Sequence, residues 1–83
     1  NMKQVLYFSA PWCIPCKKFQ PVIQSLQSEM SITKIDISSS PKTAEDWNVR
    51  SIPTILIIKK GVERGRLTGV QTEAAIKDLY NKI

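Results

Sequence analysis

The most informative part of this chain is residues 8–17, which read FSAPWCIPCK. The residues that lead into it, Val5-Leu6-Tyr7-Phe8, are almost continuously apolar and β-prone, as expected for a strand that is buried on both faces. Pro11 is expected to end this strand. From about Cys13 to Met30, apolar side chains recur every three or four residues, which predicts one face of a helix. The sequence therefore predicts a buried strand, a turn and a helix, with two closely spaced cysteines where the helix begins.

The next part of the chain predicts a second strand and a short helix. Pro21 lies inside the first predicted helix, where it removes a backbone hydrogen bond and should kink the helix. A second strand is expected over residues 32–38. Ser40 and Pro41 are residue types preferred at a helix start, so a short helix is expected from there to about Trp47. Two strands that can pair in parallel and are joined by a helix form a right-handed βαβ unit.

The C-terminal part predicts a hairpin and a last helix. Residues 54–60, whose centre reads ILII, carry the strongest signal for a buried strand in the sequence. The more polar strand expected over residues 62–68 suits an exposed sheet edge. Thr72 can cap the last helix. The predicted fold class is α/β with the order βαβαββα, a mixed four-stranded sheet flanked by helices, in a single domain over residues 1–83.

The composition argues against several functional classes. The chain has 83 residues and no apolar run near the ~20 residues that cross a bilayer, so no membrane association is expected. The net charge is +5, but Lys and Arg are spread along the chain, so no nucleic-acid partner is expected. There is no histidine, and the two cysteines supply only two of the four ligands that a closed structural zinc site needs. We therefore expect no metal site.

The beginning of the sequence suggests a cellular location. Asn1 before Met2 is interpreted as the remnant of an expression tag, which would make Met2–Ile83 the complete chain. No signal-peptide pattern is present, so a cytoplasmic location is expected. Because that compartment keeps thiols reduced, disulfide reduction is the expected direction of any thiol chemistry.

Several motifs together identify a family resemblance. Residues 8–17, followed by Pro21 in the next helix, resemble the active-site segment of thioredoxins, and residues 34–37 resemble the strand that follows. Residues 49–54, VRSIPT, are similar to the family's loop with a cis-proline, and Gly69 matches the glycine opposite the active site. The similarity extends over essentially the whole chain. It implies a thioredoxin-like fold in a minimal form, without the N-terminal strand and helix of full-length thioredoxins.

The resemblance also implies a thiol–disulfide oxidoreductase that reduces protein disulfides and needs no cofactor. Cys13 lies where the helix begins, and the positive end of the helix dipole favours a thiolate there. Cys16 is one helical turn further along, on the same side of the helix. Cys13 is therefore predicted to be the nucleophile that forms a mixed disulfide with substrate, and Cys16 the residue that resolves it. Pro15 stiffens the segment between them.

Other residues are predicted to bind substrate. Trp12 could shield the mixed disulfide and offer a flat apolar surface, whereas Trp47 is interpreted as a core residue. By resemblance, a cis peptide bond before Pro53 would leave backbone groups of Ile52 free beside Cys13, where an extended substrate segment could pair with them. Gly69 could leave space for that segment or simply form the turn after the edge strand.

The proton acceptor for Cys16 is a separate question. Many thioredoxins have a buried aspartate beneath the second cysteine, and this chain has Tyr7, interpreted as a core residue. Lys34, Asp36 or a water molecule could accept the proton instead. The dipeptide between the cysteines is Ile-Pro, where Gly-Pro is usual.

The expected partners are disulfide-containing proteins and a reductant that is either thioredoxin-reductase-like or glutathione-dependent, and the chain is expected to be a monomer. Two alternatives stay open. A glutaredoxin-like protein would use glutathione, with Lys17, Lys18 or Arg50 as a basic contact. A non-enzymatic binding subunit of thioredoxin fold would carry its cysteines incidentally.

Overall fold

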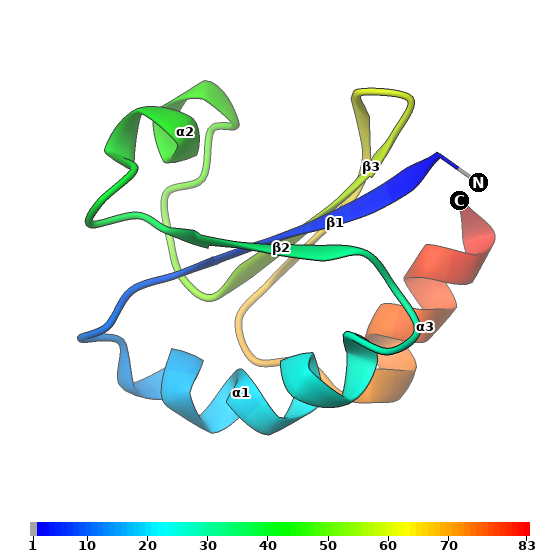
Figure 1. Cartoon of the computed structure of the whole chain (residues 1–83), viewed down its shortest axis with the longest axis horizontal. Helices are drawn as coiled ribbons and strands as arrows, with labels where there is room; N and C mark the ends of the chain where they lie inside the picture. The colour runs from blue at the N-terminus through cyan, green and yellow to red at the C-terminus, as the bar shows by residue number, and fades with distance from the viewer. Residues whose placement is uncertain (1) are drawn as a thin grey trace.

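Four strands pair in one mixed sheet in the order β2-β1-β3-β4 (Figure 1). The computed structural model describes residues 2–83. Strand β1 is parallel to β2 and antiparallel to β3, and β4 is antiparallel to β3 at the edge. This confirms the predicted element order and the mixed sheet. In chain order the elements are β1 (Lys3–Ser9), α1 (Ile14–Leu26), β2 (Ile32–Asp36), α2 (Pro41–Asp46), β3 (Thr54–Lys59), β4 (Val62–Thr68) and α3 (Glu73–Lys82).

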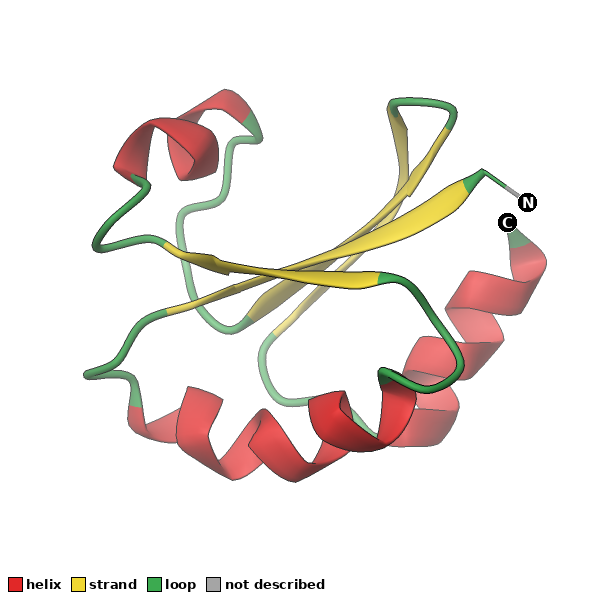
Figure 2. Ribbon diagram, in the orientation of Figure 1, coloured by secondary structure: helices red, strands yellow, loops and turns green. Residues whose placement is uncertain are grey.

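The helices form two layers, one on each face of the sheet. Figure 2 shows α1 and α3 on one side and α2 on the other. Side chains of β1 alternate between these layers, because successive residues of a strand point to opposite faces. Val5 and Tyr7 pack in the cluster beneath α1 and α3, whereas Leu6 and Phe8 pack in the cluster beneath α2. The prediction of a strand buried on both faces is therefore confirmed.

Two predicted boundaries are wrong, for local reasons. Helix α1 ends at Leu26, before the predicted Met30, because the backbone N–H groups of Glu29 and Met30 both donate to the carbonyl of Leu26 and turn the chain. Met30 is still buried. Strand β2 ends at Asp36 instead of residue 38, because the Asp36 carboxylate accepts hydrogen bonds from the backbone and the hydroxyl of Ser38. Such a turn by an aspartate side chain competes with the sheet ladder.

The predicted helix starts are confirmed. Ser40 precedes α2 and Pro41 is its first residue, although the Ser40 side chain makes no capping hydrogen bond. Thr72 caps α3 by accepting a hydrogen bond from the backbone N–H of Ala75. None of the helices formed by residues 2–83 is both long and apolar enough to span a bilayer.

The edge strand β4 is adapted to hold α3. A bulge lies between Glu63 and Gly65, which pair with the consecutive residues Ile58 and Ile57 of β3. A Cβ atom on Gly65 would approach side-chain atoms of Leu79 and Ile83 to 3.0 Å. The absence of a side chain at Gly65 therefore lets α3 pack closely on the sheet.

Candidate active site

Cys13 and Cys16 form a disulfide at the start of α1, with their Cα atoms 5.2 Å apart. Cys13 is the N-cap residue, in extended conformation, and its Sγ accepts a hydrogen bond of 3.2 Å from the backbone N–H of Cys16. The backbone N–H of Cys13 donates to the carbonyl of Ala10 at 3.1 Å, which fixes the turn between β1 and α1. The first backbone N–H groups of a helix have no carbonyl partner within the helix, so they stabilise an anion placed near them. The same donor would therefore stabilise a Cys13 thiolate after reduction.

The loop before β3 packs against this disulfide. The side chain of Ile52 contacts the cluster of Ala10, Cys13 and Cys16, and the Ile52–Pro53 peptide bond is cis. Within residues 2–83 neither the backbone N–H nor the carbonyl of Ile52 makes a hydrogen bond. The structure thus brings the predicted loop beside the predicted cysteines, and the backbone groups of Ile52 remain available for hydrogen bonds with another chain.

The backbone of Gly69 is hydrogen-bonded to the C-terminal end of this loop. Its backbone N–H donates to the carbonyl of Pro53 at 2.8 Å, and its φ of +87° lies in the left-handed region that favours glycine. A Cβ atom at Gly69 would meet no atom within 4 Å. Both sequence interpretations of Gly69 agree with this geometry, because it forms the turn after β4 and leaves open space next to Pro53.

Exposed apolar side chains flank Cys13 in the sequence, although the two cysteines themselves are only 5% and 4% exposed. Trp12 is 66% exposed and Ile14 58%, directly before and after Cys13. Val70, which follows Gly69, is 52% exposed. Trp47 instead packs against the cluster beneath α2, as expected for a core residue. Neither Ile14 nor Val70 was singled out from the sequence, although an isoleucine in the exposed first turn of a helix was a usable signal of a binding surface.

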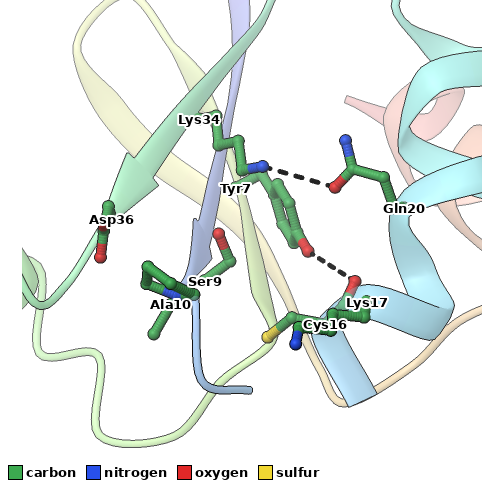
Figure 3. Close-up of a pocket in the computed structure, with 9 residues that line it drawn as sticks. Tyr7, Ser9, Ala10, Cys16, Lys17, Gln20, Lys34 and Asp36 are labelled. Carbon is green, nitrogen blue, oxygen red and sulfur yellow. Dashed lines mark hydrogen bonds between the residues drawn. The ribbon is translucent and has the colours of Figure 1, made fainter. Parts of the chain in front are cut away.

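A pocket of about 270 Å³ lies beside Cys16 (Figure 3). It brings together Cys16 and both side chains predicted as proton acceptors, Lys34 and Asp36. The Lys34 amine, however, donates to Oε1 of Gln20 at 3.4 Å. Hydrogen bonds from Ser38 hold the pKa of Asp36 below its usual value, which makes this carboxylate a weaker base. The lining residues are Tyr7, Ser9, Ala10, Pro11, Cys16, Lys17, Gln20, Lys34 and Asp36.

Tyr7 occupies the centre of the structure beneath Cys16. Its ring is fully buried and meets Phe19 edge to face, with centroids 5.7 Å apart. Its hydroxyl donates to the backbone carbonyl of Cys16 at 3.4 Å (Figure 3). Burial raises the pKa of Tyr7, with a smaller opposing effect of Ser9. The phenol is therefore neutral near pH 7 and acts as a donor, and the interpretation of Tyr7 as a core residue is confirmed.

The raised pKa of Tyr7 predicts a loss of stability in alkali. A group whose pKa is higher in the folded state stabilises the fold below its unfolded pKa, here about 10. That contribution is lost as the pH rises through the folded pKa. We expect the free energy of unfolding to fall less steeply above about pH 10 in Tyr7→Phe than in the wild type. At pH 7 the variant should lose at most about 1 kcal/mol, because only one long hydrogen bond is removed.

Urea denaturation between pH 7 and 11 measures this difference. Tyr80→Phe, which leaves Tyr7 in place, is the matched control and should retain the wild-type profile. Parallel profiles of wild type and Tyr7→Phe would show that the buried phenol does not contribute to the alkaline transition.

This arrangement defines a class of protein. A cysteine pair at the first turn of α1, after β1 of a βαβ unit and against a loop with a cis-proline, characterises a thiol–disulfide oxidoreductase of thioredoxin fold. Within residues 2–83, no three or more His, Cys, Asp or Glu side chains are grouped so that they could hold a metal ion.

Comparison with known proteins gives the same result. The family model for thioredoxin matches residues 1–82. The thioredoxin of Chlamydia trachomatis serovar D is 41% identical, over 90% of this chain and 76% of that protein. The thioredoxin of Rickettsia typhi is 37% identical, over 99% of this chain and 82% of that protein. A further relative from Arabidopsis thaliana is 36% identical, but the chain spans only 55% of it.

Solved structures agree in fold. A mutant thioredoxin from Halobacterium salinarum NRC-1 superposes with a TM-score of 0.92 at 31% identity, covering 99% of this chain and 74% of that one. The chain belongs to the thioredoxin family. It is a thiol–disulfide oxidoreductase whose redox-active pair is Cys13 and Cys16.

Proposed function

We propose that this protein reduces disulfide bonds in other proteins and that Cys13 makes the first attack. The observation that carries this proposal is the hydrogen bond from the Cys16 backbone N–H to Cys13 Sγ, in a disulfide against which the side chain of Ile52, a residue with unpaired backbone groups, packs. One feature stabilises the attacking thiolate, and the other provides a place for the segment that carries the substrate sulfur.

The reaction then has two steps. The Cys13 thiolate attacks one sulfur of the substrate disulfide, which forms a mixed disulfide and releases the other substrate sulfur as a thiolate. The Cys16 thiolate next attacks Cys13 Sγ, which releases the second substrate thiolate and forms the Cys13–Cys16 disulfide. Two electrons pass from the protein dithiol to the substrate. The substrate thiolates are protonated by solvent.

Cys16 has to lose its proton before the second step. Burial raises the pKa of Tyr7 and keeps it a neutral phenol, which is a very weak base, so it is not the acceptor. Lys34 and Asp36 line the same pocket as Cys16, but their side chains are hydrogen-bonded to Gln20 and Ser38. We therefore assign the role of acceptor to water in this pocket, which has room for several molecules.

Substrate binding combines backbone pairing with apolar contact. An extended segment can hydrogen-bond to the free backbone groups of Ile52, a mode that needs little side-chain specificity. Trp12, Ile14 and Val70 offer apolar surface to the residues around the substrate disulfide. Open space at Gly69 leaves room for the segment. This combination suits diverse protein disulfides rather than one small molecule.

The compartment and the reductant belong to the same proposal. A protein that donates electrons to disulfides works where thiols are kept reduced, so we assign it to the cytoplasm. A thioredoxin-reductase-like enzyme is the reductant that family membership favours over glutathione.

Turnover with two reducing systems tests this proposal. We expect the protein to reduce insulin disulfides at least ten times faster with NADPH and a thioredoxin reductase than with glutathione, NADPH and glutathione reductase. The double variant Cys13→Ser, Cys16→Ser controls for uncatalysed reduction. The opposite ratio would indicate a glutaredoxin-like protein. An absence of turnover with both systems, and with dithiothreitol, would indicate a non-enzymatic binding subunit.

A further inference from the structure

The side chain of Arg66, on the edge strand β4, makes two kinds of contact with its planar guanidinium. Its Nε and Nη2 atoms bind the two carboxylate oxygens of Glu63 at 2.8 and 2.9 Å. Its Nη2 and Nη1 atoms also donate to the backbone carbonyls of Trp47 at 2.6 Å and Asn48 at 3.0 Å. Glu63 thus holds the guanidinium in one orientation, and the remaining donors reach a segment 18 and 19 residues away in sequence.

The two carbonyls lie at the end of α2, where the chain leaves the helix for the active-site loop. Trp47 is the C-cap residue of α2, and Asn48 has a left-handed φ of 58°. Carbonyls at a helix end lack helical partners and carry partial negative charge, so a cation stabilises them. Arg66 therefore fixes the point from which residues 49–53 run to the disulfide.

The other end of this connection is also fixed by the edge strand. The Gly69 N–H donates to the carbonyl of Pro53, and Thr68 pairs with Thr54 at the start of β3. Figure 2 shows the connection from α2 to β3 as one long loop. Both of its ends are thus hydrogen-bonded to residues of β4 or the turn after it. Between these two points lies Ile52, which contacts the disulfide and is proposed to pair with substrate.

We propose that Arg66 is a positioning residue for the redox reaction: through Trp47 and Asn48 it sets the position of Ile52 against Cys13 and thereby the affinity for protein substrates. The proposal rests on the function proposed above. Arg66 itself touches neither cysteine. Its loss should therefore weaken the binding of an extended protein segment and leave the chemistry of the cysteine pair unchanged.

Kinetics with two kinds of substrate test this proposal. In Arg66→Met we expect KM for insulin to rise at least fivefold, with kcat and the rate of reduction of a small aromatic disulfide within twofold of wild type. The reduction potential should be unchanged. Arg66→Lys, which keeps a cation that can reach one carbonyl, should restore part of the affinity. Arg64→Met on the same strand is the matched control, because Arg64 is exposed, and should behave as wild type.

Hydrogen exchange gives a readout that does not depend on the substrate. The Val49 N–H donates to the carbonyl of Ala44 at 2.8 Å, just after the carbonyls that Arg66 holds. We expect this amide to exchange at least ten times faster in Arg66→Met. Unchanged exchange of the Val49 amide, or equal losses of activity with insulin and with the small disulfide, would overturn the proposal.

If Arg66→Met does not fold, Glu63→Gln is the second variant, because it removes the charge that orients the guanidinium. The same two measurements then test the proposal. A wild type that reduces the small disulfide but not insulin would refute the proposed function, and the exchange rate would still test the positioning of the loop.

Discussion

Cys16→Ser is expected to turn the protein from a catalyst into a trap for its substrates. In this variant Cys13 can still attack a substrate disulfide, but no second thiol is present to release the product. Multiple-turnover reduction should fall by roughly a thousandfold or more, because both cysteines act as one unit. Mass spectrometry should detect one substrate molecule bound per protein, released by dithiothreitol.

Cys13→Ser is the matched variant and should lose turnover to the same extent without forming the trapped species. Burial does not distinguish the two cysteines, since they are 5% and 4% exposed. The distinction comes from the backbone N–H of Cys16, which is directed at Cys13 Sγ. Trapping by Cys13→Ser in place of Cys16→Ser would show that the two roles are exchanged.

Phe19→Ala is expected to cause the largest loss of stability. Phe19 is fully buried on α1 and meets the ring of Tyr7, so it joins the helix that begins at the cysteines to the centre of the sheet. Truncation of a buried phenylalanine costs about 3–5 kcal/mol. Small domains have only ~5–15 kcal/mol in total, so most of the stability of this chain should be lost. We expect the Tm to fall by about 15 °C or more.

Lys18→Ala provides the control for this experiment. Lys18 is exposed on the same helix, so its truncation should change the free energy of unfolding by less than about 0.5 kcal/mol. Urea denaturation of both variants, with the disulfide intact, measures the difference. A loss below about 1 kcal/mol in Phe19→Ala would contradict the assignment of Phe19 to the core.

The fold was predictable because its signals are local. The apolar run at Val5–Phe8 and the helical spacing after Cys13 each depend on nearby residues, and the short connections leave few topologies. The helix end at Leu26 and the strand end at Asp36 were less predictable. At each of these points the chain forms a hydrogen-bonded turn, and the turn differs little in free energy from a continuation of the helix or strand by one more residue.

The candidate site was predictable only in part. Spacing alone placed Cys13 and Cys16 at a helix start, and the cis bond before Pro53 was expected only from the family resemblance. Parallel pairing of Tyr7 with Lys34 explains why two predicted proton acceptors reach the pocket beside Cys16. The Asp36–Ser38 hydrogen bonds follow a local pattern that the sequence analysis did not use, whereas nothing in the sequence indicated that Lys34 would bind Gln20.

The contacts of Arg66 could not be predicted from the sequence. An arginine in a polar edge strand suggests a solvent-exposed side chain. Its partners, however, are backbone carbonyls of Trp47 and Asn48, which lie 19 and 18 residues away in the sequence. Carbonyl groups are present in every residue, so no residue pattern indicates which of them an arginine will bind.

The equilibrium reduction potential of the Cys13–Cys16 pair is the most direct test of the assigned chemistry. It can be measured in glutathione redox buffers, with the exposed Trp12 as a fluorescence reporter and thiol alkylation as an independent readout. We predict a reversible two-electron transition near about −270 mV, the value typical of thioredoxins. A value near −200 mV would point to coupling with glutathione, and one near −120 mV to an oxidant of thiols. If no reversible two-electron transition were found, Cys13 and Cys16 would not be a catalytic redox pair.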